Sequence, residues 1–292
     1  MKYRTVAELV QLACQKNKTI GEVVLEQEIQ ATARRSEEIW SNMEKSLQIM
    51  EQAVEKGIQE AVYSRSGLTG GDAKKLKDYA NTGQSLSQGV ILDAVNFALA
   101  TSEVNASMGL IVATPTAGSS GVLPGCILAA GKQRNSTREQ MIHALFNAGG
   151  VGFVIANNAT ISGAAGGCQA EVGAASAMAA SAVVELAGGT PQQCSEAGAI
   201  ALKNLLGLVC DPVAGLVEVP CVKRNSMGAA VAIVAADMAL AGITSVIPFD
   251  EVIEAMYKIG AMLPSCLRET SQAGLATTPT GIKLTEKIHP QV

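Results

Sequence analysis

The sequence predicts an all-α fold, in which a charged N-terminal helical layer covers an Ala/Gly-rich helical core. Helix start signals recur along the 292 residues, and no stretch shows the sustained apolar–polar alternation that is typical of half-buried strands. Aromatic residues make up only 3% of the chain, so we expect small side chains and close approach of helices in the core. No linker is long or polar enough to force a second domain, and residues 1–292 are expected to form a single one.

The charge distribution separates the layer from the core. Residues 1–80 carry 12 Lys and Arg and 12 Asp and Glu, half of the charged residues of the chain. Residues 81–292 are sparsely charged and rich in Ala and Gly. This division predicts a solvated helical layer over a buried Ala/Gly-rich core.

Two capping boxes begin the N-terminal layer. Thr5 with Glu8 is expected to begin a short helix. Thr19 with Glu22 is expected to begin a long charged helix that runs to about Lys56, with one apolar stripe at helical spacing. We interpret this helix as a scaffold, or as one that packs against a partner.

In the core, N-cap residues and terminal Gly or Pro residues mark the helix ends. The expected helices cover 73–80, 86–101, 136–149, 169–187, 190–206, 225–241 and 250–262. Their N-cap signals include Ser136, Asn225 and Asp250. Residues 151–155 could form a short strand or a further core segment.

Composition excludes several classes of function. The net charge of −4 and the absence of a polybasic run argue against nucleic-acid and membrane-surface binding. The uncharged run 104–131 contains Asn, Thr, Ser and Pro residues, so we expect a buried helix and loop rather than a membrane span. Seven scattered cysteines predict free thiols or metal ligands in a reducing cytoplasm, not disulfides.

Gly- and Pro-rich segments interrupt the core helices and are candidates for binding. Residues 116–121 have the composition of an anion-binding nest, although a tight helix–helix turn would have the same composition. The candidate substrate-binding residues in these segments are Thr116, Gly118, Ser119, Ser120, Asn157, Asn158 and Arg268.

Three cysteines are candidate metal ligands: Cys168, Cys210 and Cys221. Three thiolates leave one position of a metal open, as catalytic metals require. Cys168 begins a predicted helix, whose N-terminus is expected to lower the pKa of its thiol. The spacing matches neither zinc fingers nor ferredoxins. From spacing alone, the cysteines could equally be buried apolar residues.

The motifs around these cysteines resemble the α chain of bacterial iron–sulfur L-serine dehydratases. The matching stretches are Gly-Cys-Gln-Ala-Glu-Val-Gly at 167–173, Cys-Asp-Pro-Val-Ala-Gly-Leu-Val-Glu-Val-Pro-Cys at 210–221 and Lys-Arg-Asn at 223–225. Thr-Pro-Thr at 114–116 and Arg-Glu-Thr at 268–270 extend the resemblance, and Leu-Thr-Gly-Gly-Asp-Ala at 68–73 resembles the two-subunit type.

The resemblance implies a 4Fe-4S cluster on Cys168, Cys210 and Cys221, with one iron open, in an all-helical catalytic domain. It also implies a separate β chain, because the family's Ser-Ser-His-Thr element is absent from this sequence. The single-chain type has a further cysteine in its C-terminal tail, whereas no cysteine follows Cys266 here. We expect Cys14, Cys126 and Cys194 to be core or helix-face residues.

The implied reaction is a lyase reaction that converts L-serine into pyruvate and ammonia. The open iron binds the serine hydroxyl, and backbone N–H groups of 116–121 or Arg268 hold the carboxylate. His143 is the candidate base, although a mid-helix histidine is also a common surface or core residue, and a β-chain group could supply the base. Lysines are few in the core, and none lies in a recognisable pyridoxal phosphate loop.

Two alternatives use the same cysteines. A related cluster lyase, such as a cysteine desulfidase, would act on another small substrate. An electron-transfer subunit would need a fourth protein ligand to the cluster.

Overall fold

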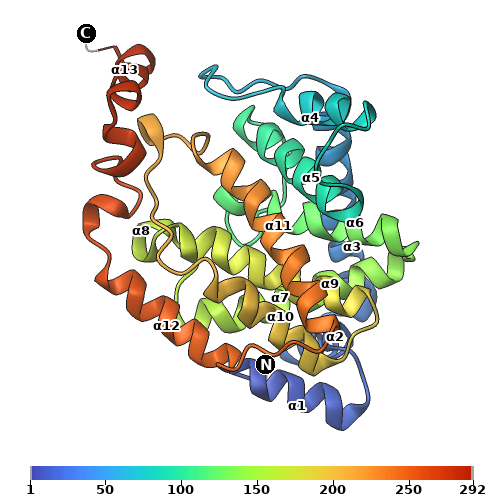
Figure 1. Cartoon of the computed structure of the whole chain (residues 1–292). Helices are drawn as coiled ribbons and strands as arrows, with labels where there is room; N and C mark the ends of the chain where they lie inside the picture. Colours follow the sequence, from blue (N-terminus) through green and yellow to red (C-terminus); the bar gives the residue numbers. More distant parts are fainter. Residues whose placement is uncertain (1, 291–292) are drawn as a thin grey trace.

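The computed structural model describes residues 2–290, and its secondary structure is helical (Figure 1). The longer helices are α1 (Val6–Lys16), α2 (Ile20–Thr32), α3 (Ser36–Gln59), α4 (Asp72–Asn81), α5 (Gly89–Ala106), α6 (Val122–Arg134), α7 (Arg138–Asn158), α9 (Ala174–Leu186), α10 (Pro191–Lys203), α11 (Cys221–Leu240), α12 (Phe249–Met262) and α13 (Pro279–Ile288). Over residues 2–290 the only β pairings are two isolated bridges. The predicted all-α class is confirmed.

Short helical turns join these helices. They are η1 (Ala117–Ser119), α8 (Gly163–Gly166), the π-helical η2 (Gln169–Gly173), η3 (Val213–Gly215), η4 (Ser265–Leu267) and η5 (Gly274–Thr277). Four of them, η1, α8, η2 and η3, lie in the Gly/Pro-rich segments or beside the cysteines that the sequence marked. Helices α6, α8 and α13 had no separate counterpart among the predicted helices.

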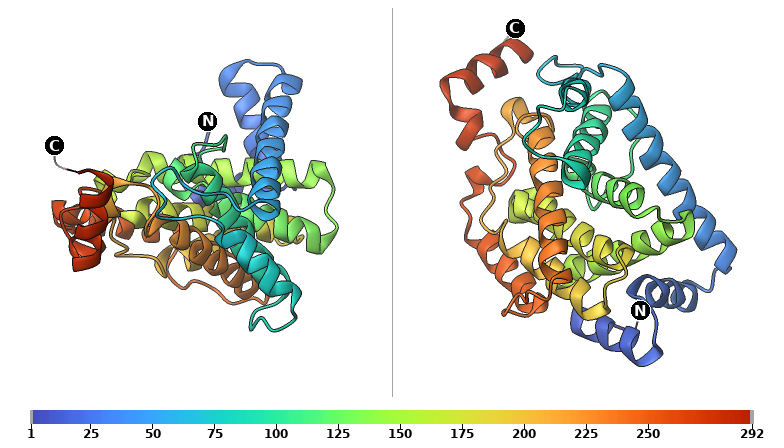
Figure 2. Two further views of the ribbon diagram at one scale, coloured as in Figure 1. Left: turned by 90° about the horizontal axis from the view of Figure 1, so that it is seen from above. Right: turned by 45° about the vertical axis from the view of Figure 1, so that its right-hand side comes forward.

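The two N-terminal capping boxes are confirmed, but the long charged helix is wrong. Thr5 and Thr19 each accept a hydrogen bond from the backbone N–H three residues on. The second helix ends at Thr32, where Ala33 adopts a left-handed conformation with φ of 54°. A new helix, α3, begins at Ser36 with two glutamates in its first turn, where the helix dipole favours acidic residues. Figure 2 shows α3 along the outer edge of the molecule.

Helix α9 forms the centre of the core. It packs against α6, α7, α10 and α11, and nearly all of its residues are buried. Small residues allow close contact between these helices, as the composition predicted. A Cβ atom added to Gly228 on α11 would lie 2.7 Å from Val172, and one added to Gly125 on α6 would lie 2.7 Å from the Ala94 carbonyl oxygen.

Helix α7 corrects two expectations. Its N-cap is Thr137, which forms a capping box with Gln140, rather than Ser136. The helix also continues through the two glycines at 149–150 and includes 151–155, which are therefore helical. Gly150 does not end the helix, because it provides the space in which α2 packs: an added Cβ would collide with Val24.

Two predicted N-caps have other roles. Asn225 lies inside α11, which begins at Cys221, and its amide donates to the Cys221 carbonyl at 2.9 Å. Asp250 lies inside α12 and caps α1 from a distance, because its carboxylate accepts from the N–H groups of Val6 at 2.8 Å and Ala7 at 3.0 Å. A carboxylate can satisfy a helix N-terminus across space as well as along the chain.

The C-terminal segment runs along the outside of the helical core, opposite the edge that α3 forms (Figures 1 and 2). After α12 it passes through η4 and η5 to α13, which packs against η3 and η5. None of the helices in the described range 2–290 combines the length and the apolarity that a membrane crossing requires.

Glu185 at the end of α9 predicts a pH dependence of stability. Its carboxylate accepts from the Gly21 N–H at 3.0 Å and the Asn147 amide at 2.7 Å, and burial raises its pKa to about 7. A folded-state pKa above the unfolded value favours the native state at low pH, so this contribution falls as pH rises from about 4.5 to 7. We expect Glu185→Gln, which keeps an acceptor oxygen, to flatten that part of the profile.

Thermal unfolding midpoints of the two proteins between pH 4.5 and 8 check this expectation. The wild type should lose more stability than Glu185→Gln over that range, with about 1.4 kcal/mol for each pKa unit. Parallel profiles would contradict it. Glu22, Glu139 and His143 line the same cavity and are unchanged in the variant, so the comparison isolates the effect of Glu185.

Candidate functional site

The structure brings Cys168, Cys210 and Cys221 together from three separate segments. Cys168 immediately precedes η2, Cys210 lies in the extended segment after α10, and Cys221 is the first residue of α11. All three residues are buried, with exposed fractions of 3%, 3% and 9%. Besides burial, the charge of Cys168 raises the pKa of both other thiols, and that of Cys221 raises the pKa of Cys210. The three thiols therefore lie close enough for their charges to affect one another.

Backbone hydrogen bonds hold the first two segments in place. The Cys210 N–H donates to the Leu267 carbonyl at 2.9 Å, and its own carbonyl accepts from the Glu269 N–H at 2.8 Å. The Gln169 N–H donates to the Leu208 carbonyl at 3.0 Å. Gly167 makes this approach possible, since it has φ of 77° and an added Cβ would lie 2.9 Å from the same carbonyl oxygen.

The third cysteine is positioned by a folded loop. Residues 210–221 turn back on themselves through η3, where Ala214 and Gly215 both have positive φ angles. The Val213 N–H closes the loop by donating to the Val219 carbonyl at 2.8 Å. As a result, the loop brings Cys221 back beside Cys210, as its length allowed.

Burial, and not the helix N-terminus, dominates the thiol pKa values. It raises the pKa of Cys168 to about 11 and that of Cys221 to about 12, and raises that of Cys210 further. The Arg224 guanidinium and the Val172 N–H act in the opposite direction on Cys168. The expected lowering of the Cys168 pKa is therefore outweighed, because desolvation disfavours a thiolate more strongly than a few donors favour it.

Two glutamates that sequence reasoning missed lie beside Cys210. One oxygen each of Glu171 and Glu269 and the Cys210 sulfur all lie within 4.8 Å of one another. Gly163 borders this group closely, because an added Cβ would lie 2.7 Å from a Glu171 oxygen and 3.2 Å from the Cys210 sulfur. A signal was present: Glu171 follows Cys168 by three residues, which places both on one helical face.

The segment 114–121 covers the other side of Glu171. The Thr116 hydroxyl donates to Glu171 Oε1 at 2.6 Å, and a Cβ added to Gly118 would lie 2.9 Å from the same oxygen. Burial raises the pKa of Glu171, while the Thr116 hydroxyl opposes the shift. The structure thus places the candidates Thr116 and Gly118 beside Glu171, a carboxylate that had not been identified.

Several N–H groups of this segment already have acceptors. Those of Thr116, Ser119 and Ser120 bond within the segment, and that of Gly121 donates to Asn225 Oδ1 at 2.9 Å. The Asn225 amide in turn donates to the Gly118 carbonyl at 2.7 Å. This pair of bonds fastens the segment to α11, one turn beyond Cys221. It leaves fewer free N–H groups for an anion than the composition suggested.

Arg268 also lies beside the cysteines. It forms the bridge partner of Cys210, and its Nη1 donates to the Ala165 carbonyl over a long 3.4 Å. Its Nε is inaccessible to solvent and has no acceptor among residues 2–290. A donor of this guanidinium thus remains available to a ligand.

The side chains of the two candidate asparagines donate hydrogen bonds to backbone carbonyls of their own helix, α7, and one of them also reaches the N-terminal segment. Asn157 donates to the Phe153 carbonyl, and Asn158 donates to the carbonyls of Val154 and Arg4. Asn158 therefore joins α7 to the N-terminal segment. These contacts do not bring either residue to the three cysteines.

His143 lies at the other end of the core. It stacks edge-on with Trp40, with ring centroids 5.2 Å apart, and lines a cavity with Glu185. Glu185 and Cys168 are at opposite ends of η2 and α9, which at 1.5 Å per residue separates them by roughly 25 Å. His143 therefore lies far from the three cysteines, which favours its interpretation as a packing residue.

The remaining cysteines are dispersed. Cys126 and Cys194 are buried, Cys14 is exposed, and Cys266 is partly buried on η4. Burial raises the pKa of both Cys126 and Cys194, as expected of core thiols.

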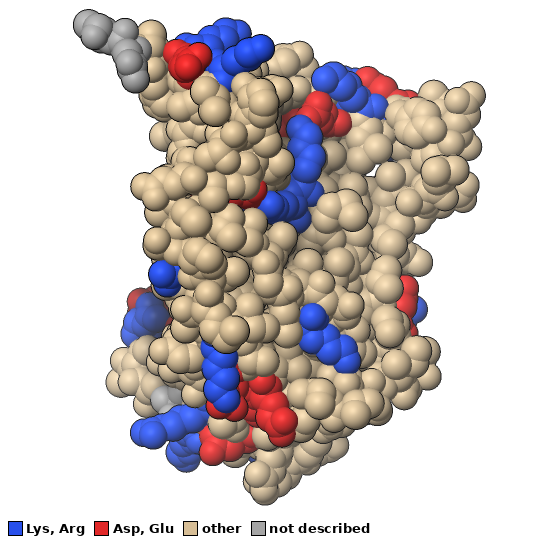
Figure 3. Space-filling model, turned by 60° about the vertical axis from the view of Figure 1, so that its left-hand side comes forward, with Lys and Arg blue, Asp and Glu red and all other residues tan. Residues whose placement is uncertain are grey.

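The face on which the C-terminal segment lies has charged side chains gathered mainly toward its two ends, and its middle is largely uncharged (Figure 3).

The donor set fits a thiolate-bound metal centre. Three buried thiols with raised pKa values are poor thiolates unless a cation compensates their charge, and a metal ion or cluster does this. The nearest further donors to Cys210 are carboxylates, which bind iron and other hard cations less tightly than a fourth thiolate binds a cluster. The arrangement can therefore hold a cluster by three thiolates and leave one metal position for a ligand.

Comparison with known proteins gives a consistent assignment. The family model described as "Serine dehydratase alpha chain" matches residues 15–276. A probable L-serine dehydratase alpha chain of Bacillus subtilis is 63% identical over 98% of this chain and 95% of its own length. The L-serine dehydratase alpha chain of Peptoniphilus asaccharolyticus is 43% identical over 96% of each chain. An L-serine dehydratase of Escherichia coli is 35% identical, and there the match covers 94% of this chain but 61% of the relative.

Proposed function

This chain belongs to the serine dehydratase alpha chain family, and from that premise we propose that it converts L-serine into pyruvate and ammonia with a 4Fe-4S cluster. Cys168, Cys210 and Cys221 would hold the cluster. The observation that carries the proposal is the convergence of these three buried cysteines from separate segments. When bound, the cluster supplies an iron that lacks a protein thiolate and can act as a Lewis acid on the serine hydroxyl.

The carboxylates beside Cys210 complement the ammonium group of serine. Glu171 and Glu269 place negative charge in a site that must accept an amino acid. Glu171 is held in one orientation by the Thr116 hydroxyl at 2.6 Å. A charge-assisted hydrogen bond to a fixed carboxylate orients the substrate more precisely than one to a mobile side chain. We therefore assign the ammonium end of serine to these two glutamates.

Arg268 is the candidate for the substrate carboxylate. Its backbone forms a bridge with that of Cys210, and its Nε donor has no acceptor among the described residues. Guanidinium groups bind carboxylates in a bidentate manner. With the ammonium at Glu171 and Glu269 and the carboxylate at Arg268, the hydroxyl and the α-proton of serine would remain available for reaction. Loss of water then gives aminoacrylate, which hydrolyses to pyruvate and ammonia.

Glu171→Gln tests the ammonium assignment. Gln keeps the size of the side chain and an oxygen for Thr116 but removes the charge. Hydrogen bonds to charged groups contribute about 1.5–3 kcal/mol, so we expect KM for serine to rise roughly 10- to 100-fold with the iron content unchanged. Steady-state kinetics with iron analysis measures both. An unchanged KM in a variant with a full cluster would refute the assignment.

A separate β chain completes the proposed enzyme. The relatives from B. subtilis and P. asaccharolyticus are named alpha chains, and the longer E. coli relative has about two fifths of its length outside the match. We propose that the β chain supplies the general base, since His143 lies far from the cysteines. A cytoplasmic location fits a cluster that needs reducing conditions.

Anaerobic pyruvate formation from L-serine by the chain together with its β partner tests the proposed function. Serine should be the preferred substrate over cysteine. Sulfide release from cysteine at a higher kcat/KM than pyruvate release from serine would instead favour a desulfidase. A complex with a filled cluster and neither activity would refute a lyase role.

A further inference from the structure

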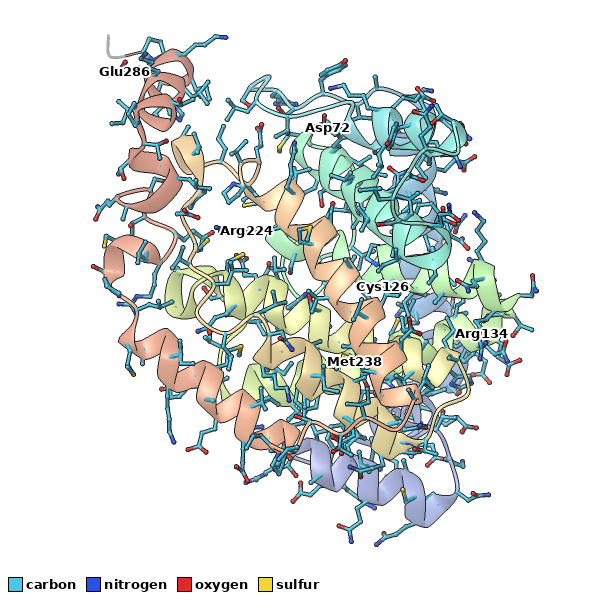
Figure 4. All side chains as sticks on the ribbon, in the orientation of Figure 1. Asp72, Cys126, Arg134, Arg224, Met238 and Glu286 are labelled. Carbon is cyan, nitrogen blue, oxygen red and sulfur yellow. The ribbon has the colours of Figure 1, made fainter. Side chains whose placement is uncertain are left out.

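Arg224 contacts both neighbours of Cys210. It lies on α11, three residues after Cys221, and Figure 4 shows it toward the N-terminal end of that helix. Its Nη1 donates to the Val209 carbonyl at 2.8 Å and lies 2.9 Å from Asp211 Oδ1. Because Val209 and Asp211 flank Cys210, one guanidinium fixes that segment relative to α11.

The same guanidinium reaches the third cysteine. Its positive charge lowers the pKa of the Cys168 thiol, against the larger effect of burial. Arg224 thus bonds to the segment of Cys210, acts electrostatically on Cys168 and belongs to the helix that begins with Cys221. Its positive charge also lowers the pKa of the Cys221 thiol, again against the larger effect of burial.

The ion pair with Asp211 is shielded from solvent. The side chains are 19% exposed for Arg224 and 4% exposed for Asp211. Removing one partner of a buried pair leaves the other charge uncompensated, which is strongly unfavourable. An arginine remains protonated in every state of the site, and its planar fork can serve several acceptors at once, which a lysine ammonium cannot do with the same geometry.

Asp211 extends the connection to the C-terminal segment. Its Oδ2 accepts from the Leu275 N–H at 2.8 Å, and Gly274 packs so closely on the carboxylate that an added Cβ would collide with it. The segment held in this way is the one that carries Arg268 and Glu269 to the site. The Arg224–Asp211 pair therefore joins α11, the Cys210 segment and the C-terminal segment.

We propose that Arg224 is a positioning residue that preassembles the three cysteine segments for the cluster and slows the loss of iron from it. This inference rests on the proposed function, because it assigns Arg224 a role toward the group held by those cysteines. This role follows from the bonds of Arg224 to Val209 and Asp211 and from its fixed charge, which also acts on Cys168. The cluster sulfurs would be next to a permanent cation that is itself held by a buried carboxylate.

The test compares Arg224→Gln and Arg224→Lys with the wild type in the complex with the β chain. Lys223→Gln is the matched control, since Lys223 is the preceding residue and pairs with Asp72 at the surface. The readouts are the iron content after anaerobic reconstitution, the rate of iron removal by a chelator, and the unfolding midpoint of the cluster-free protein. Loss of an outer-shell partner lowers metal affinity by about 10- to 100-fold.

We expect iron release at least roughly 10-fold faster in Arg224→Gln, an intermediate rate in Arg224→Lys and the wild-type rate in Lys223→Gln. A folded Arg224→Gln that releases iron at the wild-type rate would overturn the inference. If Arg224→Gln does not fold, Arg224→Lys takes its place, and release of iron from it at the wild-type rate would overturn the inference. Failure of the proposed function is separate, because it would appear as a wild-type protein that takes up no iron–sulfur cluster.

Discussion

Replacing any one of Cys168, Cys210 and Cys221 with Ala is expected to abolish both the bound cluster and the activity. Each residue would supply one of only three protein thiolates, so two would remain to hold three irons. Lewis-acid stabilisation is worth several kcal/mol in the transition state, and its loss corresponds to a fall in kcat of about 10³-fold or more. Iron and sulfide analysis of anaerobically prepared protein, with pyruvate assays, measures both effects.

Cys14→Ala and Cys266→Ala are the matched controls. Cys14 is exposed on α1, and Cys266 lies on η4, two residues before Arg268. Both variants should keep about four irons per chain, the content of one 4Fe-4S cluster. Retention of the cluster in any of the three site variants would contradict the ligand assignment. Its loss in Cys266→Ala would show that the C-terminal segment supplies a ligand after all.

The second large effect concerns the β chain. The α chain with a filled cluster but without its partner is expected to turn over serine at least roughly 10²-fold more slowly than the complex, since general base catalysis contributes about that much. The reason is the position of His143, which packs on Trp40 in the cavity that Glu185 lines, away from the three cysteines. Serine turnover by the same cluster-loaded α chain, with and without β chain, gives the ratio.

His143→Ala in the complex is the internal comparison. A packing role predicts activity within a few-fold of the wild type and a lower unfolding midpoint, because the stacking with Trp40 is lost. A loss of roughly 10²-fold in kcat with the cluster retained would fit a general base instead. Equal activity of the α chain alone and of the complex would refute the requirement for the partner.

Local signals in the sequence were sufficient for the fold class and for most helices. Capping boxes at Thr5 and Thr19 and the Pro at the start of α10 act within one turn, so they can be recognised without the tertiary structure. The predicted helix ends were wrong where contacts with residues distant in the sequence determine the structure. Gly150 permits packing with α2 instead of ending α7, and Asp250 caps a helix that lies far away in the chain.

In the candidate site, too, local sequence signals indicated some residues, whereas the roles of others depend on distant contacts. The cysteine motifs indicated the three thiols, because their sequence context is long and specific. Glu269 and Arg224 could not be placed by pattern, since their roles depend on a bridge between Cys210 and Arg268 and on bonds across the 210–221 loop. The direction of the Cys168 pKa was also beyond the sequence, because burial outweighs the helix terminus only in the folded core.

The central claim is that three cysteines hold a four-iron cluster with one iron free to bind serine. Mössbauer spectroscopy of the anaerobic α–β complex, reconstituted with iron-57, tests it most directly. We expect four irons, one of which differs from the other three and changes its spectrum when serine is added. Four irons that are unaffected by serine, or a zinc-containing protein without iron, would contradict it.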